Sequence, residues 1–199
     1  MRNTVFVFAR APRLGAVKRR LAREMGARAA LDFHRTTMIA LLRALAAKRR
    51  FRTVLALTPD HARFPLPVRV ARIGQGGGDL GARMQRAASR VKRGHVVIIG
   101  CDIPDARAAD VMAAFRALGR AEAVFGPAED GGYWLVGLSP RRPARPFAAV
   151  RWSTAHALAD TLANFRGRRV SVLRTLRDVD TAADLRSVRR CQSLRQYPA

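Results

Sequence analysis

Several carboxylates of this chain stand directly after apolar segments, where they could do chemistry. Asp102 follows the segment "VVIIG", and Asp178 and Asp180 alternate along "RDVD" near the end. A carboxylate at the carboxyl end of a buried strand is a typical ligand of a phosphate-bound Mg²⁺ or Mn²⁺. Each also has a structural alternative: Asp102 could cap a helix, and Asp180 and Thr181 could begin one, with Asp184 completing a capping box. Because the chain has only 14 acidic residues, a crevice that gathers them implies a divalent cation to balance their charge.

A basic loop follows the first apolar segment, in "ARAPRLGAVKRRL". Pro12 and Gly15 shape the loop, and Lys18, Arg19 and Arg20 cluster where a helix should begin. Backbone N–H groups at such a junction, together with nearby cations, form a phosphate cradle, although the sequence is neither a Walker A motif nor GxGxxG. A solvated basic turn is the alternative. Lys18 is one of only three lysines, which slightly favours a functional role.

Consecutive glycines precede a helical pattern in "IGQGGGDLGARM", which contains Gly78, Asp79 and Gly81. Asp79 could simply cap that helix. The glycines offer more than capping requires, because they let the backbone approach a flat group such as a base or a ribose.

The segment "GPAEDGGYWLVGL" places Asp130, Gly131 and Gly132 in front of a strand that begins near Tyr133. Asp-Gly is a common turn dipeptide, so a turn without function is one interpretation. The other is a carboxylate at the sheet edge beside Asp102, with the glycines leaving room for a ligand. Further along, Trp152 could contact an acceptor or could pack ahead of an ordinary helix cap.

Short apolar segments alternate with helical patterns along the chain. The expected strands are Thr4–Ala9, Thr53–Thr58, His95–Gly100, Glu122–Gly126, the segment from Tyr133 to Leu138 and Arg169–Leu173. The expected helices are Ala27–Lys48, Leu80–Lys92, Ala109–Gly119 and Thr154–Phe165. This alternation predicts an α/β fold with a mainly parallel sheet covered by helices on both faces. Ligands of such a sheet bind at the carboxyl ends of the strands, where the motifs above lie.

Composition predicts one folded domain over residues 1–199. The net charge of +24 permits a polyanionic partner, but 35 of the 38 basic residues are Arg, spread along the chain with few aromatics between them. Nucleic-acid binding is therefore not the favoured function. Cys101 and Cys191 have no CxxC spacing and predict no disulfide framework. No apolar run reaches the length of a signal peptide or of a membrane span, so we expect a cytoplasmic protein.

From Phe6 to about Leu185 the chain resembles the DUF2064 family. The motifs that carry this resemblance are, in order, "ARAPRLGAVKRRL", "GDLGARM", "GCDIP", "GPAEDGGYWLVGL", "RWST" and "DVDTAADL". The resemblance implies a three-layer α/β/α fold of the glycosyltransferase A type, with a nucleotide at the sheet's carboxyl edge. It implies Mg²⁺ or Mn²⁺ on Asp102 and Asp180. The nucleotide-binding residues that it implies are Ala11, Pro12, Gly15, Lys18, Arg20, Gly78, Asp79 and Gly81. The family's loop usually has Thr at position 19 and Lys at position 10, whereas this chain has Arg at both, which retains or adds positive charge.

The resulting hypothesis is a metal-dependent transferase that uses an activated nucleotide and a small-molecule acceptor. Lys18 would hold phosphates, and Asp130 would act as general base for the acceptor hydroxyl or orient it. On the acceptor side we expect Gly131, Gly132, Tyr133 and Trp152. Glycosyl transfer from a nucleotide-sugar is slightly favoured; nucleotidyl transfer to a phosphorylated or carboxylated acceptor is the alternative, because a basic loop suits a leaving pyrophosphate. A non-catalytic nucleotide- or RNA-binding protein is the alternative of another class, and the sequence does not indicate an oligomeric state.

Overall fold

The computed structural model describes residues 3–188, in which a seven-stranded sheet is covered by helices. The strands are β1 (Thr4–Arg10), β2 (Arg52–Thr58), β3 (Ala71–Gly74), β4 (Val96–Gly100), β5 (Ala123–Pro127), β6 (Tyr133–Leu138) and β7 (Val170–Val172). The helices are α1 (Arg19–Met25), α2 (Ala27–Ala46), α3 (Leu80–Ser89), α4 (Ala108–Ala117) and α5 (Ala157–Ala163). Residues 182–188 are also helical.

The sheet is mainly parallel, as predicted. Its strand order is β3-β2-β1-β4-β6-β5-β7, and β6 is antiparallel to both of its neighbours while the other pairs are parallel. The carboxyl ends of β1 to β4 therefore share one edge with the amino end of β6. That topology brings the segment before β6 to the same edge as Asp102, which follows β4.

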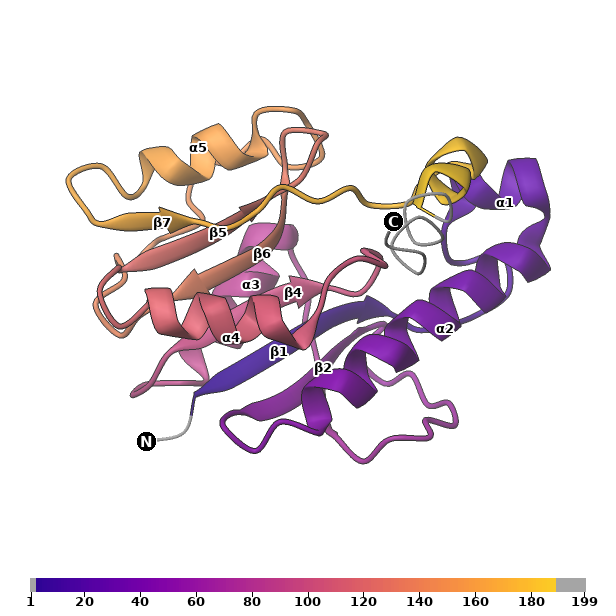
Figure 1. The fold of residues 1–199 in the computed structure, drawn as a ribbon, viewed down its shortest axis with the longest axis horizontal. Coiled ribbons are helices and arrows are strands. Elements are labelled where there is room, and N and C mark those ends of the chain that lie inside the picture. Colours follow the sequence, from indigo (N-terminus) through magenta and orange to yellow (C-terminus); the bar gives the residue numbers. More distant parts are fainter. Residues whose placement is uncertain (1–2, 189–199) are drawn as a thin grey trace, which may run out of the picture.

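The three layers follow from alternation along the strands. In β1, Val5, Val7 and Ala9 face a core with α2 and α4, whereas Phe6 faces a second core with α3 and the region of α5. Figure 1 shows α2 and α4 over one face of the sheet and α3 behind it. Both faces are buried, which is why the strands appear in the sequence as continuous apolar runs.

A third cluster lies at the end of the sheet that carries the site. Leu21 of α1 and Ala30 of α2 pack against Val179 and Leu185 from the C-terminal segment. In Figure 1 the yellow C-terminal helix accordingly lies beside α1. This contact fixes the basic loop before α1 relative to the carboxylates near residue 180.

The predicted strands and helices are present, and the predicted three-layer α/β/α fold with a mainly parallel sheet is confirmed. The short strand β3 was not predicted, because "ARIG" offers a single large apolar residue for pattern recognition. Cys101 is buried, and Cys191 lies outside the described residues. Within residues 3–188, no helix combines the length and apolar character that crossing a membrane requires.

Candidate active site

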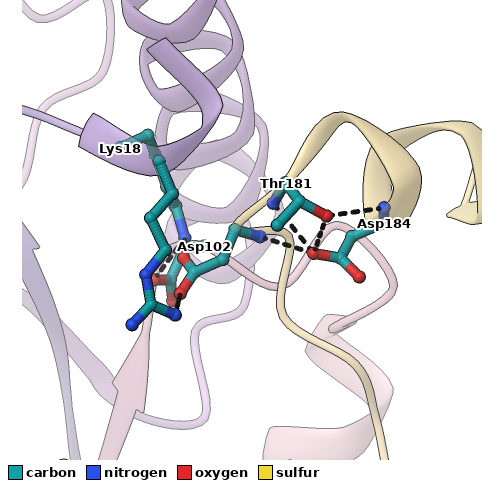
Figure 2. Close-up of polar contacts among 6 residues, drawn as sticks. Lys18, Asp102, Thr181 and Asp184 are labelled. Carbon is teal, nitrogen blue, oxygen red and sulfur yellow. Dashed lines mark hydrogen bonds and ion pairs between the residues drawn. The ribbon is translucent and has the colours of Figure 1, made fainter. Parts of the chain in front are cut away.

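Lys18, Asp102 and Asp180 meet at the carboxyl edge of the sheet. The Lys18 ammonium donates hydrogen bonds of 2.9 Å to Oδ2 of Asp102 and to Oδ1 of Asp180. Its side chain is only 6 % exposed, whereas the two carboxylates are 38 % and 41 % exposed. Figure 2 shows Lys18 reaching from the loop before α1 to Asp102 after β4. Asp102 and Asp180 lie 84 and 162 positions after Lys18 in the sequence, and both thus contact its side-chain nitrogen.

A capping box at the start of the helix over residues 182–188 holds the Asp180 backbone. Oδ2 of Asp184 accepts hydrogen bonds from the backbone N–H groups of Asp180 and Thr181, at 3.2 and 2.8 Å, and the Asp184 N–H donates back to the Thr181 hydroxyl at 3.2 Å. Figure 2 shows this reciprocal pair. The capping interpretation is thus confirmed for Thr181 and Asp184, and it leaves the Asp180 carboxylate available to Lys18.

The Lys18 ammonium and the Asp102 carboxylate stabilise each other in their charged forms. Burial by itself lowers the pKa of Lys18, but the charges and hydrogen bonds of Asp102 and Asp180 outweigh it and raise that pKa above its ordinary value. Burial likewise favours a higher pKa for Asp102, yet Lys18 holds it below the usual range. The ammonium and the Asp102 carboxylate are therefore both ionised at neutral pH.

The backbone at Lys18 is in the left-handed region, with φ 46° and ψ 53°. For a residue with a Cβ this conformation costs roughly 1–2 kcal/mol. Glycine would remove that cost, so the presence of Lys indicates that its side chain is needed there.

Buried polar side chains anchor the ends of β1 and β2 beside the cluster. His34 is 4 % exposed, and its Nε2 lies 2.9 Å from the Arg10 carbonyl oxygen, which can only accept, so Nε2 carries the hydrogen. Gln75 donates from its amide nitrogen to the carbonyls of Ala9 and Ala56, at 3.2 and 2.9 Å. The side chains of His34 and Gln75 both line the cleft that lies over Lys18.

A cleft of about 490 Å³ opens over Lys18. Four cations line it together with Asp102 and Asp180, namely Arg10, Lys18, Arg19 and Arg20. Arg20 also lies 3.7 Å from Asp180, and its side chain is 75 % exposed. Such a surface suits an anionic group several atoms long, as a diphosphate is. We call this cavity the basic cleft.

A second cavity, of about 230 Å³, lies on the other side of Asp102. Asp102 and Leu80 line both cavities, so the two are contiguous. We call the second cavity the acceptor chamber. It is lined by Leu80, Gly100, Asp102, Ile103, Ala128, Asp130, Gly132, Tyr133, Trp134, Trp152, Ser153, Thr154, Ala157 and Asp178.

Three of the four predicted acceptor-side residues line the chamber, namely Gly132, Tyr133 and Trp152, and so does Asp130, the predicted general base. The space left by Gly131 is filled by protein, because a Cβ there would lie 2.2 Å from the Ala155 carbonyl oxygen. The Asp130-Gly131 turn is also real: Oδ1 of Asp130 accepts from the Gly132 N–H at 2.9 Å. The turn interpretation is therefore confirmed, and the Asp130 carboxylate lines the cavity. The expectation that Gly131 leaves room for a ligand is wrong, because Ala155 takes that space, and a role for Asp130 in the reaction stays a prediction.

The glycine-rich segment is placed differently from the expectation. Asp79 caps α3, accepting from the Ala82 N–H at 2.7 Å. A Cβ on Gly81 would lie 2.8 Å from the Trp152 ring, and one on Gly78 would lie 2.9 Å from the Ala82 Cβ. These residues do not line the basic cleft, and what the "GDLG" motif brings to it is Leu80.

Three predicted nucleotide-binding residues of the basic loop, Ala11, Pro12 and Gly15, also lie outside the lining of the cleft. Ala11 is buried and donates its N–H to the Thr58 carbonyl at 2.9 Å, and Gly15 has φ 72°. They shape the loop that carries Lys18 and Arg20.

Sequence reasoning did not assign His34, Gln75 or Leu80 to the site, although all three line the cavities. His34 and Gln75 give no local signal, because their partners are backbone carbonyls far along the chain. Asp178, which the sequence placed in an acidic cluster with Asp102 and Asp180 but to which it gave no separate role, lines the acceptor chamber. Burial, followed by the charges of Asp180 and Asp102, raises the pKa of Asp178.

The donor set fits a hard divalent cation only in part. Within residues 3–188 no three acidic, His or Cys side chains are grouped closely enough to hold a metal by themselves. Asp102 and Asp180 do converge on one cation, the Lys18 ammonium. Mg²⁺ is commonly bound by one or two carboxylates, with substrate phosphates and water completing its shell. The two carboxylates fit that pattern if a phosphate ligand supplies the remaining oxygens.

The comparisons with known proteins agree with this architecture. The chain belongs to the DUF2064 family, described as "Uncharacterized protein conserved in bacteria", whose profile matches residues 41–154. No curated protein matches the chain in sequence. A crystal structure of a "putative nucleotide-diphospho-sugar transferase" from Desulfovibrio desulfuricans G20 is 30 % identical, with a TM-score of 0.89 over 96 % of this chain and 88 % of that one.

More distant structures share the fold alone. A cytidylyltransferase from Leptospira borgpetersenii serovar Hardjo-bovis is 14 % identical, with a TM-score of 0.64 over all of this chain and 89 % of that one. The Rv0371c protein of Mycobacterium tuberculosis H37Rv, in complex with manganese, is 19 % identical, with a TM-score of 0.53 over 94 % of this chain and 98 % of that one. These likenesses place the chain among folds that include nucleotide-using transferases.

Proposed function

We propose that this protein is a metal-dependent transferase that moves a glycosyl group from a nucleotide-sugar to a small acceptor. The observation that carries the proposal is the cluster of Lys18, Asp102 and Asp180 at the junction of two cavities, one lined with cations and the other with aromatic rings and carboxylates. The 30 % identical relative bears a matching name. In this arrangement the basic cleft takes the nucleotide diphosphate and the acceptor chamber takes the acceptor.

The residues divide the work as follows. Lys18 and Arg20 contact phosphate oxygens and stabilise the charge that develops on the leaving nucleoside diphosphate. Mg²⁺ or Mn²⁺, held by Asp102 and Asp180, supplies further charge neutralisation when bound. Asp130 presents Oδ2, for which the described residues offer no hydrogen-bond donor, to the acceptor hydroxyl.

The proposed reaction balances without a further reactant. The acceptor oxygen forms a bond to the anomeric carbon of the sugar while the bond from that carbon to the phosphate oxygen breaks. The nucleoside diphosphate leaves with the electron pair, and the acceptor proton passes to Asp130.

Nucleotidyl transfer is the second candidate, favoured by one specific observation. Four cations line the basic cleft, and a leaving pyrophosphate needs more cationic contacts than a nucleoside diphosphate does. The two reactions release different products, so phosphate-specific chromatography separates them: a nucleoside diphosphate in the first, pyrophosphate in the second.

Calorimetric titration of nucleoside triphosphates and nucleotide-sugars, with and without Mn²⁺, tests the proposal. We expect one ligand to bind in a Mn²⁺-dependent manner and to lose at least about tenfold in affinity in Asp102→Asn. Asp32→Asn is the matched control, because Asp32 is an exposed residue of α2 that lines neither cavity. Binding that ignores both Mn²⁺ and Asp102 would refute the proposed mechanism.

A further inference from the structure

The acceptor chamber contains no basic side chain. Among its lining residues, all within the described part of the chain, there is no Lys, Arg or His. This composition stands out in a protein with 38 basic residues and a net charge of +24. It contrasts most sharply with the adjoining basic cleft, which four cations line.

The charged side chains that line the chamber are carboxylates. Asp102 shares the Lys18 ammonium, 2.9 Å away, with Asp180, whereas no ion pair with a basic side chain is seen for Asp130 or Asp178 within the described residues, so the chamber is negatively charged. Asp130 is exposed and uses Oδ1 to accept from the Gly132 N–H. An anion entering this cavity meets two carboxylates of its own sign in a partly desolvated space.

The arginines nearest the chamber in sequence are held by ion pairs. Arg151, next to Trp152, is paired with Asp160 at 2.8 Å. Arg177, next to Asp178, is paired with Glu129 at 2.5 Å. Neither guanidinium lines the cavity, so neither offers an anionic ligand a direct contact there.

The walls suit a small polyhydroxyl compound. Tyr133 and Trp152 meet edge to face with ring centroids 6.3 Å apart, and both line the cavity. Aromatic faces pack against the C–H faces of sugar rings, while Asp130 and Asp178 can accept hydroxyl hydrogens. The volume of about 230 Å³ lies below the roughly 300–1,000 Å³ typical of sites for drug-sized ligands, which suits one ring rather than an oligosaccharide.

We infer that the acceptor is a small polyhydroxyl compound, neutral or amine-bearing, and that the chamber excludes acceptors that carry a phosphate or a carboxylate. This inference rests on the proposed function, because the chamber is an acceptor site only if the basic cleft takes the nucleotide. Exclusion by like charge is a common source of specificity.

Quenching of tryptophan fluorescence tests the charge of the chamber without any nucleotide. The chain has two tryptophans, and Trp134 is 3 % exposed, so accessible emission reports on Trp152, with Trp152→Phe as the check. We compare iodide with caesium at constant ionic strength, each normalised to N-acetyltryptophanamide. The inference predicts that caesium is favoured over iodide despite the net charge of +24.

Removing the chamber's carboxylates should reverse that preference. In the double variant Asp130→Asn, Asp178→Asn we expect the caesium-to-iodide ratio to fall by at least roughly threefold. Asp32→Asn removes a remote carboxylate and should leave the ratio unchanged. Preferential quenching by iodide in the wild type would overturn the inference.

Acceptor specificity supplies the second measurement. Glucose, glucosamine and glucose 6-phosphate share one ring and differ in charge, and each is tested for stimulated release of the nucleoside diphosphate from the nucleotide-sugar that binds. We expect the neutral or amine-bearing probe to stimulate release at least tenfold more than the phosphorylated one. The reverse order would overturn the inference. If no nucleotide or nucleotide-sugar binds, the proposed function is refuted, but the quenching experiment still reports the charge of the chamber.

Discussion

Replacing Lys18 with Met tests whether the ammonium is what holds two carboxylates together. Met keeps most of the length of the side chain and introduces no new backbone preference at φ 46°, so the change removes the charge and little else. In the wild type the ammonium lies between the two carboxylates, whose charges and hydrogen bonds raise the pKa of Lys18. In Lys18→Met, Asp102 and Asp180 face each other without the ammonium between them, and the exposed Arg20, 3.7 Å from Asp180, is the cation that remains.

The magnitude follows from the distances. Both carboxylate oxygens lie 2.9 Å from the same nitrogen, so they are at most about 6 Å apart, and their repulsion at an effective dielectric constant of about 20 is about 3 kcal/mol. Because the carboxylates are 38 % and 41 % exposed, water screens part of this repulsion. We expect a loss of about 1–2 kcal/mol in the free energy of unfolding. For a chain of this size that loss lowers Tm by roughly 2–8 °C.

Urea and thermal unfolding at pH 7.5, with and without Mn²⁺, measure the effect. Mn²⁺ should restore the stability of Lys18→Met more than it raises that of the wild type, because in the wild type the ammonium competes for the same two carboxylates. Lys18→Arg retains the charge and should lose less. Lys48→Met is the matched control, because Lys48 is exposed after the end of α2. A Lys18→Met variant as stable as the wild type and indifferent to Mn²⁺ would refute the three-charge cluster.

Further predictions concern the groups around this cluster. Asp184→Ala should lower the free energy of unfolding by about 1 kcal/mol through loss of the capping box, and it should weaken Mn²⁺-dependent nucleotide binding by freeing the backbone at Asp180, which calorimetry can measure. His34 is buried, and burial lowers its pKa below 6.5, so the unfolded chain binds its proton first. The stability that His34 contributes should therefore decline as pH falls below about 6.5, and His34→Gln, which keeps a donor for the Arg10 carbonyl, should lack that decline in urea titrations at pH 7.5 and 5. Burial raises the pKa of the Cys101 thiol, so mass spectrometry should find Cys101 unlabelled by iodoacetamide in native protein and labelled in urea.

The sequence predicted the fold class and the central cluster because both rest on local signals. Continuous apolar runs gave the buried strands, and Asp102 follows one of them closely. Lys18 and Asp180 lie further beyond β1 and β7, and they were assigned from the basic loop and from the family resemblance. A parallel sheet brings the ends of its strands to one edge, so those residues had to lie near one another. The capping box of Thr181 and Asp184 was recognisable from its spacing alone.

What the sequence could not supply depends on packing between distant segments. The glycine signals are the clearest case: Gly81 accommodates the Trp152 ring and Gly131 accommodates Ala155, although a close approach to a ligand would have explained both equally well. Leu80, the first residue of α3, lines both cavities. Its place there depends on where α3 begins relative to β4 and β6, and no local sequence pattern predicts that position.

The net charge of +24 is a poor guide to the site, because its sign does not hold locally. The Arg174 guanidinium is paired with Asp110 at 2.7 Å and that of Arg168 with Glu122 at 2.5 Å, so part of the basic surface is already neutralised by the few acids present. Four cations line the basic cleft, whereas the adjoining acceptor chamber is lined by the three carboxylates of Asp102, Asp130 and Asp178. Lining charges of opposite sign favour an anionic donor in the basic cleft and an acceptor that is not anionic in the acceptor chamber. Asp102 lines both cavities and lies where they adjoin. Specificity of this protein is therefore expected to depend on ionic strength in opposite directions for the two substrates: added salt should weaken nucleotide binding and should relax the exclusion of phosphorylated acceptors.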